Sequence, residues 1–277
     1  MTGFLNLDKP EGMSSAAVVN RVKWLTRTPC GHMGTLDPLA CGVLPVGVGN
    51  AARLFDYFLS KRKTYEARFV FGATTDTLDR EGEIVRGGDI PDGGNIEAAL
   101  ARFVGEIEQI PPKYSAVSVG GRRGYALARG GEEFTLAARR VKVYSFRLTG
   151  QTAPDEYGFE IVCGAGTYIR SLARDLAAAL GTQGYMSYLR RTASGVFTAD
   201  AAVAPDALTR ENVETYLILT ETVLPFPELG ETDARIFNGV GVAADCADGL
   251  YKLRRDGVFY GIARVKDGVA RAEKKLC

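Results

Sequence analysis

The sequence predicts an α+β fold with a small β-rich domain at its C-terminal end. Strand-like and helix-like patterns are mixed along the chain without the regular alternation of α/β proteins. Of the 277 residues, 46% are hydrophobic and 24% are charged, so a sizeable buried core is expected. The composition changes near residue 230, which indicates the separate C-terminal domain.

The first elements are a turn and a helix. Residues 8–15, DKPEGMSS, contain turn residues followed by two serines, and either Ser14 or Ser15 can accept the first free N–H of a helix. Apolar residues three and four apart then predict a helix near 15–26. Its buried side is marked by Val18, Val22 and Leu25.

The next stretch, residues 31–49, is predicted to be a long structured loop. It contains five glycines and two prolines, which argues against regular structure. Long loops inside compact domains are often functional.

The remaining elements follow from apolar spacing and from glycine or proline punctuation. Strands are predicted at 65–71, 140–148 and 157–163. Helices are predicted at 95–104, 120–131, 168–180 and 209–217. Residues 72–94 are expected to form a loop, and residues 109–117 an extended segment. Short strands are expected over 232–277, with turns at Asp256-Gly257 and Asp267-Gly268.

Several classes of protein are disfavoured by composition. No segment approaches 18 uninterrupted apolar residues, and the N-terminus does not resemble a secretory signal. Five cysteines without a CxxC pair, and a single histidine, argue against a disulfide framework and against a Cys/His zinc site. We therefore expect a cytoplasmic protein with reduced thiols and no metal.

Charge alone gives an ambiguous answer about nucleic acid. The net charge is only +1, but residues 200–250 carry two Lys/Arg against ten Asp/Glu, whereas residues 251–277 carry eight against three. Residues 1–199 are mildly basic, with 24 Lys/Arg against 20 Asp/Glu. Phosphate binding depends on where cations lie, so an RNA partner stays possible beside the simpler reading of an unevenly charged surface.

One segment resembles a known catalytic signature. Residues 31–54, GHMGTLDPLACGVLPVGVGNAARL, are similar to the active-site loop of TruB-type tRNA pseudouridine synthases. Further stretches resemble other motifs of this family in the expected order, and together they cover about residues 3–200, which is far more specific than one short motif. They are DKPEGMSS at 8–15, KTYEARFVFGATTDTLDREGE at 63–83, QIPPKYSAVSVGGRRGYALARGGEE at 109–133, CGAGTYIRSLARDLAAALG at 163–181 and YLRRTASGVF at 188–197.

The resemblance implies a domain organisation. It predicts a pseudouridine synthase-like mixed sheet with flanking helices over residues 1–230, with an insert around 90–140. Residues 231–277 would form a C-terminal β domain of the PUA type, and they are short for one.

The resemblance also implies a reaction, the conversion of a uridine in the T-loop of tRNA to pseudouridine. The glycosidic N–C bond breaks, the uracil rotates and a C–C bond forms, so no redox cofactor or metal is needed. Asp37 would be the catalytic carboxylate, acting either as a nucleophile or in glycal formation. Arg170 would pair with Asp37 and keep it ionised. Taken alone, Asp37 would be an ordinary turn residue and Arg170 a surface arginine.

Four further residues match positions that contact the substrate in this family. Tyr65 and Tyr168 would be active-site tyrosines: one would stack on the base, and its hydroxyl could also handle a proton, so Tyr65 counts as catalytic as well. Leu189 would lie beside the bound uridine. His32 would enter the RNA loop and help to displace the target nucleotide. Without the resemblance, all four would be taken as structural or incidental.

A basic cluster between the loop and the strand at 65–71 is predicted to contact RNA phosphates, although a solvated charge run is the simpler alternative. It consists of Arg53, Lys61, Arg62 and Lys63. Asp79 matches an acidic position of the family and is expected to organise its own loop.

Other functions stay open at this point. A non-catalytic RNA-binding or tRNA-folding module would use the same basic surface but would not need the Asp37–Arg170 pair. A related enzyme could have another RNA target or a guide-RNA partner. A hydrolase that does not act on RNA lacks support, because no paired-carboxylate or Ser/His/Asp spacing is evident. The preferred prediction is a monomeric enzyme that binds the T-arm of tRNA.

Overall fold

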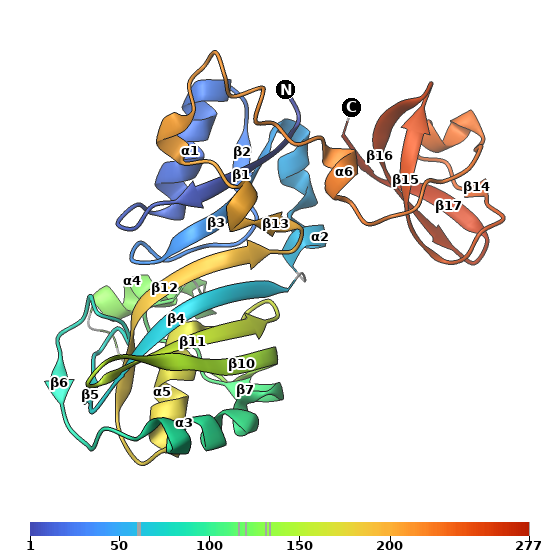
Figure 1. Ribbon diagram of the computed structural model, residues 1–277. Coiled ribbons are helices and arrows are strands. Elements are labelled where there is room, and N and C mark those ends of the chain that lie inside the picture. Colours follow the sequence, from blue (N-terminus) through green and yellow to red (C-terminus); the bar gives the residue numbers. More distant parts are fainter. Residues whose placement is uncertain (60–61, 116, 120, 131, 133, 277) are drawn as a thin grey trace.

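The computed structural model describes residues 1–59, 62–115, 117–119, 121–130, 132 and 134–276. These residues form a large body around a mixed sheet and a smaller C-terminal body around an antiparallel sheet (Figure 1). The prediction of an α+β fold with a C-terminal β domain is confirmed. No helix in the described part of the chain is long and apolar enough to cross a membrane.

The large sheet has the strand order β1-β3-β12-β4-β11-β10-β7, with β2 paired to β3 and β13 paired to β12. Strands β3 and β12 run parallel, whereas their neighbours pair antiparallel. The bounds are β1 (Gly3–Lys9), β2 (Cys30–His32), β3 (Cys41–Val48), β4 (Lys63–Phe71), β7 (Gly105–Gln109), β10 (Arg139–Ala153), β11 (Glu156–Cys163), β12 (Gly184–Ser194) and β13 (Phe197–Thr198). Two small ribbons pair β5 (Ala73–Thr74) with β6 (Val85–Arg86) and β8 (Ser118–Val119) with β9 (Arg122–Arg123).

Helices cover this sheet, and their starts and ends follow local sequence signals. The α-helices are α1 (Ser15–Thr26), α2 (Phe55–Leu59), α3 (Gly93–Leu100), α4 (Gly124–Arg129), α5 (Ile169–Ala179) and α6 (Thr220–Val223). Short 3₁₀ turns are η1 (Gly49–Leu54), η2 (Ala101–Phe103), η3 (Ala199–Ala201), η4 (Pro205–Ala207) and η5 (Ala234–Asn238). Ser14, not Ser15, caps α1, because its side chain accepts a hydrogen bond from Ala17 N. Gly181 ends α5 with a φ of 75°, as expected of a C-terminal glycine.

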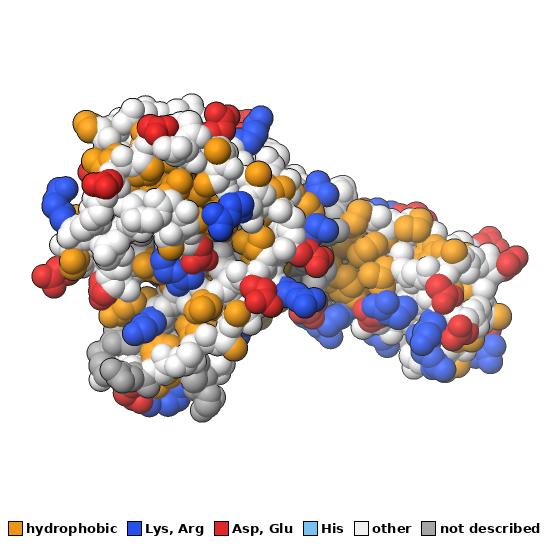
Figure 2. Space-filling model, turned by 90° about the horizontal axis from the view of Figure 1, so that it is seen from below, with side chains coloured by type: hydrophobic (Ala, Val, Ile, Leu, Met, Phe, Trp, Pro, Cys, Tyr) orange, Lys and Arg blue, Asp and Glu red, His pale blue; other side chains and the backbone are white. Residues whose placement is uncertain are grey.

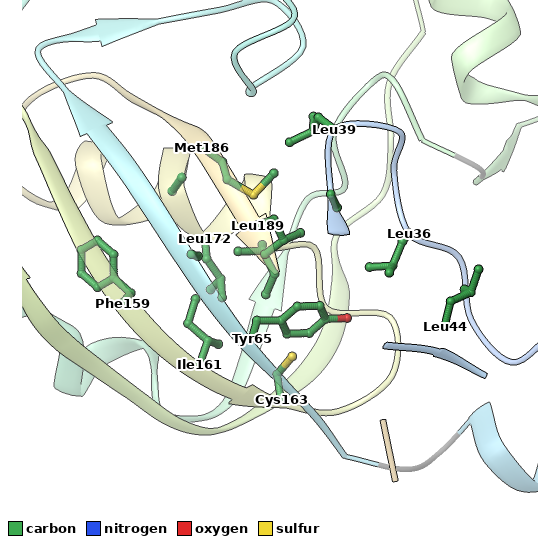
Figure 3. Close-up of a cluster of buried hydrophobic side chains, with 14 of the residues drawn as sticks. Leu36, Leu39, Leu44, Tyr65, Phe159, Ile161, Cys163, Leu172, Met186 and Leu189 are labelled. Atoms are coloured by element: carbon green, nitrogen blue, oxygen red, sulfur yellow. The ribbon is translucent and has the colours of Figure 1, made fainter. Parts of the chain in front are cut away.

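The core lies between the large sheet and helices α1, α3 and α5. On β4, burial alternates, so that Tyr65, Ala67 and Phe69 face inward. Phe69 packs against Phe159 with ring centroids 4.7 Å apart. Figure 3 shows Tyr65 at the rim of this core, with its hydroxyl pointing toward the segment that carries Leu36.

Two predicted elements are wrong. The segment 31–49 is largely strand, because β2 and β3 occupy both of its ends and leave only residues 33–40 as a loop. Its glycines serve close packing: a Cβ on Gly42 would lie 2.2 Å from the Arg191 carbonyl oxygen. The helix predicted at 209–217 is a series of turns, in which Asn212 Oδ1 accepts from the Thr209 backbone N–H.

The other predicted helices and strands are present, with shifted ends. The helix predicted at 95–104 is divided into α3 and η2, and the one predicted at 120–131 is the short α4. Strands β1 and β12 had no counterpart among the predicted elements.

The C-terminal sheet has the strand order β14-β17-β16-β15. Its strands are β14 (Val242–Ala243), β15 (Gly249–Arg255), β16 (Val258–Lys266) and β17 (Val269–Lys275). Both predicted hairpin turns are confirmed, since Asp256-Gly257 and Asp267-Gly268 have positive φ at both positions.

The two bodies share one apolar cluster. Phe4 and Phe58 from the large body contact a group that includes Leu224, Ile262 and Leu276. Asn50 Nδ2 also donates to the Leu276 carbonyl oxygen at 3.0 Å. The C-terminal sheet is thus docked on the large body through a buried contact. The exact boundary near residue 230 stays a prediction.

Candidate active site

A cavity of about 300 Å³ lies where the loop 33–40 meets strands β4 and β12 and the start of α5. It brings together Asp37, Lys63, Tyr65, Tyr168, Arg170 and Leu189, all of which were singled out in the sequence. Ser115 and Arg191 also line it. Ligand sites commonly occur in concave regions of this size that carry a few convergent polar groups.

The loop holds Asp37 through backbone hydrogen bonds. Ala40 N donates to the Asp37 carbonyl oxygen at 3.0 Å, which closes a turn with Pro38 at its second position. Just before it, the Ser15 hydroxyl accepts from Leu36 N at 2.9 Å and donates to Leu36 O at 2.8 Å. The N-terminal turn of α1 therefore fixes the residue next to Asp37.

Lys9 anchors the other end of this turn. Its side chain is fully buried, and its ammonium donates to the carbonyl oxygens of Pro10, Met13 and Pro38 at 2.9, 2.5 and 3.2 Å. Burial lowers the pKa of Lys9 to about 8. Lys9 thereby ties the turn at 10–13 to the loop that carries Asp37.

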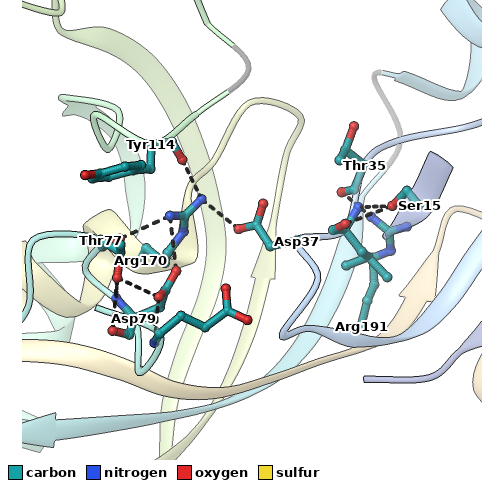
Figure 4. Close-up of polar contacts among 10 residues, drawn as sticks. Ser15, Thr35, Asp37, Thr77, Asp79, Tyr114, Arg170 and Arg191 are labelled. Carbon is teal, nitrogen blue, oxygen red and sulfur yellow. Dashed lines mark hydrogen bonds and ion pairs between the residues drawn. The ribbon is translucent and has the colours of Figure 1, made fainter. Parts of the chain in front are cut away.

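Arg170 holds two carboxylates at once (Figure 4). Its Nη2 lies 2.7 Å from Asp37 Oδ2 and its Nη1 lies 3.2 Å from Asp79 Oδ2. The same guanidinium donates to the carbonyl oxygens of Thr77 and Tyr114 at 3.1 and 3.0 Å. The side chains of Arg170 and Asp79 are 6% and 4% exposed, whereas that of Asp37 is 38% exposed. Arg170 is therefore held from behind, and Asp37 is the carboxylate that faces the cavity.

Asp79 is fixed in turn by its own loop. Its Oδ1 accepts from the Thr77 hydroxyl at 2.7 Å and from Glu81 N at 3.0 Å. These bonds place the second Asp79 oxygen against Arg170, so the organising role expected for Asp79 extends to the ion pair.

The start of α5 is positioned by Gln109 at the end of β7. Its side-chain amide accepts from Tyr168 N at 2.8 Å and donates to Tyr168 O at 3.1 Å. Ser171 Oγ adds a bond to Ile110 O at 2.9 Å. Tyr168 is the N-cap residue of α5, and Arg170 lies in the first turn of that helix. These hydrogen bonds therefore fix the positions of both residues at the cavity.

The floor of the cavity comes from two neighbouring strands. Lys63 and Tyr65 share the inner face of β4, and Leu189 and Arg191 share the inner face of β12. Arg191 is buried, and its guanidinium donates to Val43 O at 2.7 Å and to Gly34 O at 3.0 Å in the loop. Burial raises the pKa of the Tyr65 hydroxyl.

Other predicted site residues lie elsewhere. His32 is on β2, opposite Val46, and does not line the cavity. Burial lowers the pKa of His32, and its Nδ1 has no hydrogen-bond partner among the described residues. Arg53 is exposed and donates to the carbonyl oxygen of Lys275 at 3.1 Å. Lys61 lies outside the described residues, and Lys63 belongs to the cavity floor.

Several supporting residues were missed by sequence reasoning. Lys9 and Arg191 stand inside motifs that were recognised, but a buried cation that bonds carbonyl oxygens leaves no periodic signal. The side-chain contacts of Ser15, Gln109 and Ser115 leave no periodic signal in the sequence either. The Ser115 hydroxyl is buried at the cavity wall and has no hydrogen-bond partner among the described residues, which leaves it available to a ligand.

The described part of the chain contains no group of three or more His, Cys, Asp or Glu side chains placed to hold a metal ion. The charged side chains that line the cavity in the described part of the chain are those of Asp37, its partner Arg170, and two further cations, Lys63 and Arg191.

Comparison with known proteins gives a consistent family assignment. Residues 23–169 match the model described as TruB family pseudouridylate synthase, N-terminal domain. Residues 170–228 match the model described as tRNA pseudouridylate synthase B C-terminal domain.

Curated relatives carry the name tRNA pseudouridine synthase B. One from Caulobacter sp. (strain K31) is 43% identical over 246 residues, which cover 86% of this chain and 79% of the relative. One from Rhodospirillum rubrum is 48% identical over 206 residues, covering 74% and 67%. One from Clostridium kluyveri is 39% identical over 281 residues, covering 96% of both chains.

Among solved structures, a chain of a Cbf5-Nop10-Gar1 complex superposes with a TM-score of 0.72 at 25% identity. The superposition covers 99% of this chain and 85% of the other.

Proposed function

The chain belongs to the TruB family of pseudouridylate synthases, and from this premise we propose that it isomerises a uridine in the T-loop of tRNA with Asp37 as the catalytic carboxylate. The observation that carries the proposal is the placement of Asp37, 38% exposed at the cavity wall and 2.7 Å from the buried Arg170. The curated relatives are named for action on tRNA, which supports tRNA as the substrate.

The pair of Asp37 and Arg170 suits this reaction. A guanidinium at ion-pair distance orients a carboxylate and balances its charge, so Asp37 is held in place while one of its faces is open to the substrate. An ionised carboxylate can either attack C1′ of the ribose or remove the proton at C2′. By both routes the uracil is released, rotates and bonds again through C5, with no net change in atoms or oxidation state.

The rest of the cavity supplies recognition. Tyr65 and Tyr168 offer aromatic faces, Leu189 offers an apolar contact, and the Ser115 hydroxyl offers an unused polar atom. A cavity of about 300 Å³ beneath a loop has room for one nucleoside. To enter it, a nucleotide must first leave the stack of bases in the RNA. His32, at the end of the strand that leads into this loop, would act as the wedge that displaces it.

Phosphate contacts are proposed outside the cavity. Arg53 is exposed, and its bond to Lys275 brings it next to the basic C-terminal strands. Lys and Arg side chains line one edge of the C-terminal body in Figure 2. This arrangement supports binding of the T-arm across both bodies. A monomer and a cytoplasmic location stay predictions.

The test is tritium release from RNA labelled at uracil C5, which reports exchange of the C5 hydrogen during isomerisation. Wild type, Asp37→Asn and Asp175→Asn would be compared on an unmodified tRNA transcript. Asp175 lies on α5 and pairs with Arg174, outside the cavity lining, so its substitution controls for the loss of one carboxylate. We expect release by wild type and Asp175→Asn, and none by Asp37→Asn with RNA affinity retained.

Two results would contradict the proposal. Wild-type turnover in Asp37→Asn would remove Asp37 from the chemistry. RNA binding without release by the wild type would favour a non-catalytic RNA-binding module.

A further inference from the structure

Three neighbouring strands meet beside the cavity at one edge of the large sheet. The register pairs Lys63, the first residue of β4, with Cys163, the last residue of β11, and it pairs Cys163 with Val143 on β10. The chain after Cys163 forms a loop, residues 164–166, that lines the cavity and ends at the exposed Gly166. This loop therefore borders the cavity where it meets solvent. Side chains packed against the loop lie next to an RNA strand whose nucleotide occupies the cavity.

Tyr144 packs against this loop from β10. A β-bulge lies between Val143 and Ser145, so Tyr144 is an extra residue without an opposite partner on β11. Bulges re-aim single side chains and are common beside active sites. A Cβ added to Gly164 would lie 4.0 Å from Tyr144 Cε2, which places the ring beside the loop. Tyr144 is half-buried and does not line the cavity, so its ring is an aromatic surface just outside it.

Arg62 lies over the ring of Tyr144. Its guanidinium carbon is 4.0 Å from the ring centroid, well within the range of a cation–π contact. Arg62 directly precedes β4, and Gly195 N donates a hydrogen bond to its carbonyl oxygen at 2.9 Å, which fixes its backbone. Arg62 is exposed, and its guanidinium forms no ion pair within the part of the chain that the structure describes. One face of the guanidinium is thus held on an aromatic ring, and the other face is open.

An extruded nucleotide creates a need for such a surface. When the target nucleotide leaves its stack, the bases on either side of it lose a neighbour, which opposes its entry into the cavity. A protein group that stacks on one of these bases offsets part of that loss. RNA-binding proteins use both aromatic rings and the planes of arginine guanidinium groups in this way.

The pair of Arg62 and Tyr144 suits a base better than a phosphate. A phosphate contact requires only positive charge, and Lys142 supplies that as well, with its Nζ 5.8 Å from the same ring centroid. The contact with Tyr144 adds order to the plane of the Arg62 guanidinium. An ordered plane matters for stacking, because a flat group gains contact with a base only when the two lie face to face.

We propose that Arg62 and Tyr144 form a second nucleobase site, in which a base directly flanking the target uridine stacks on the open face of the Arg62 guanidinium. This inference rests on the proposed function, because the flanking base is defined by a uridine in the cavity. Arg62 is the binding residue, and Tyr144 is a positioning residue that orders the guanidinium. The site differs from the phosphate contact predicted for the basic cluster, because it depends on the planar shape of the guanidinium as well as on its charge.

The test measures the affinity for T-arm RNA hairpins in which an abasic ribose replaces the base directly 5′ or directly 3′ of the target uridine. Wild type, Arg62→Lys and Tyr144→Leu would be compared on the complete hairpin and on both abasic hairpins. Lysine keeps the positive charge of Arg62 but has no planar group on which a base can stack. Arg147→Lys is the matched control, because Arg147 is an exposed arginine of β10 that pairs with Glu160.

On the complete hairpin, we expect Arg62→Lys and Tyr144→Leu to bind about tenfold more weakly than wild type, as is usual when one base loses its stacking partner. On one of the two abasic hairpins the difference should shrink to within about twofold, because the base that stacks on Arg62 is missing there. Comparing variant and wild type on the same RNA cancels any effect of the abasic ribose on the RNA itself. Arg147→Lys should bind all three hairpins as wild type does.

Two results would overturn the stacking site. Equal affinities of Arg62→Lys and wild type for the complete hairpin would mean that the plane of the guanidinium is not used. A loss of affinity that persists on both abasic hairpins would mean that no flanking base contacts Arg62. Thermal unfolding shows whether Tyr144→Leu is folded, and Arg62→Lys, a change at an exposed side chain, keeps the test decisive if it is not.

Failure of the proposed function gives a separate signal. Tritium release from the complete hairpin, labelled at uracil C5, would be measured with wild type beside the binding experiments. Release by wild type together with unchanged affinity of Arg62→Lys would overturn the stacking site alone. Absence of release would overturn the proposed function and, with it, the site for a flanking base.

Discussion

Two carboxylates share the guanidinium of Arg170, but they differ in what else they contact. Asp37 faces the cavity, whereas Asp79 is buried and accepts hydrogen bonds from the Thr77 hydroxyl and from Glu81 N. A buried charge that loses its partner is strongly destabilising, so the Arg170 side chain depends on Asp79 as much as Asp37 depends on Arg170. The orientation of the Asp37 carboxylate therefore depends, through Arg170, on a residue that is itself almost completely buried.

We expect Asp79→Asn to lower kcat about tenfold and to reduce stability by about 1–3 kcal/mol, because the neutral amide bonds the guanidinium more weakly than a carboxylate does. Steady-state kinetics and thermal unfolding would be measured beside Glu83→Gln, an exposed acidic neighbour in the same loop. If Asp79→Asn matches Glu83→Gln in both kcat and stability, Asp79 does not hold Arg170 in place.

At the scale of elements, two adjacent serines at the start of α1 have two separate structural roles. Ser14 caps the helix, while Ser15 bonds both the N–H and the carbonyl oxygen of Leu36, next to the turn that begins at Asp37. The turn that presents Asp37 is thus fastened to a helix that is far from it in the sequence.

Substituting Ser14 and Ser15 one at a time distinguishes these two roles. We expect Ser14→Ala to cost about 1 kcal/mol of stability with kcat unchanged, because only a cap bond is lost. Ser15→Ala should cost about 1–3 kcal/mol and also lower kcat, because two buried backbone groups of Leu36 lose their partner. Thermal unfolding and kcat of both variants would be compared. A normal kcat in Ser15→Ala would mean that the loop holds Asp37 by its own turn alone.

The elements also show which structures the sequence could predict. Helices α1 and α5 follow from apolar spacing and end signals, which are local, and Asp37 and Arg170 follow from family motifs. Strand β3 was missed because its glycines suggest a loop, although Gly42 is needed for close contact with Arg191. The floor role of Lys63 could not be predicted, because burial of a lysine depends on which strand lies next to it.

For the whole molecule, the question is whether the C-terminal sheet is an appendage or part of one folding unit. The apolar cluster between the bodies includes Phe4 near one end of the chain and Ile262 and Leu276 near the other. Phe4 also packs on Phe58 with ring centroids 4.8 Å apart. Loss of the C-terminal contact would expose these aromatic side chains of the large body, so the two bodies should unfold together.

Ile262→Ala tests this coupling, because Ile262 is fully buried in the shared cluster. We expect a loss of about 2–5 kcal/mol, the usual cost of a large-to-small change in a core. At about 2–4 °C per kcal/mol for a chain of this size, calorimetry should show one transition moved down by several degrees. Val258→Ala on the same strand, at a side chain that is 64% exposed, should leave the transition nearly unmoved. Two transitions, of which only the smaller one shifts in Ile262→Ala, would instead show that the C-terminal sheet unfolds independently of the large body.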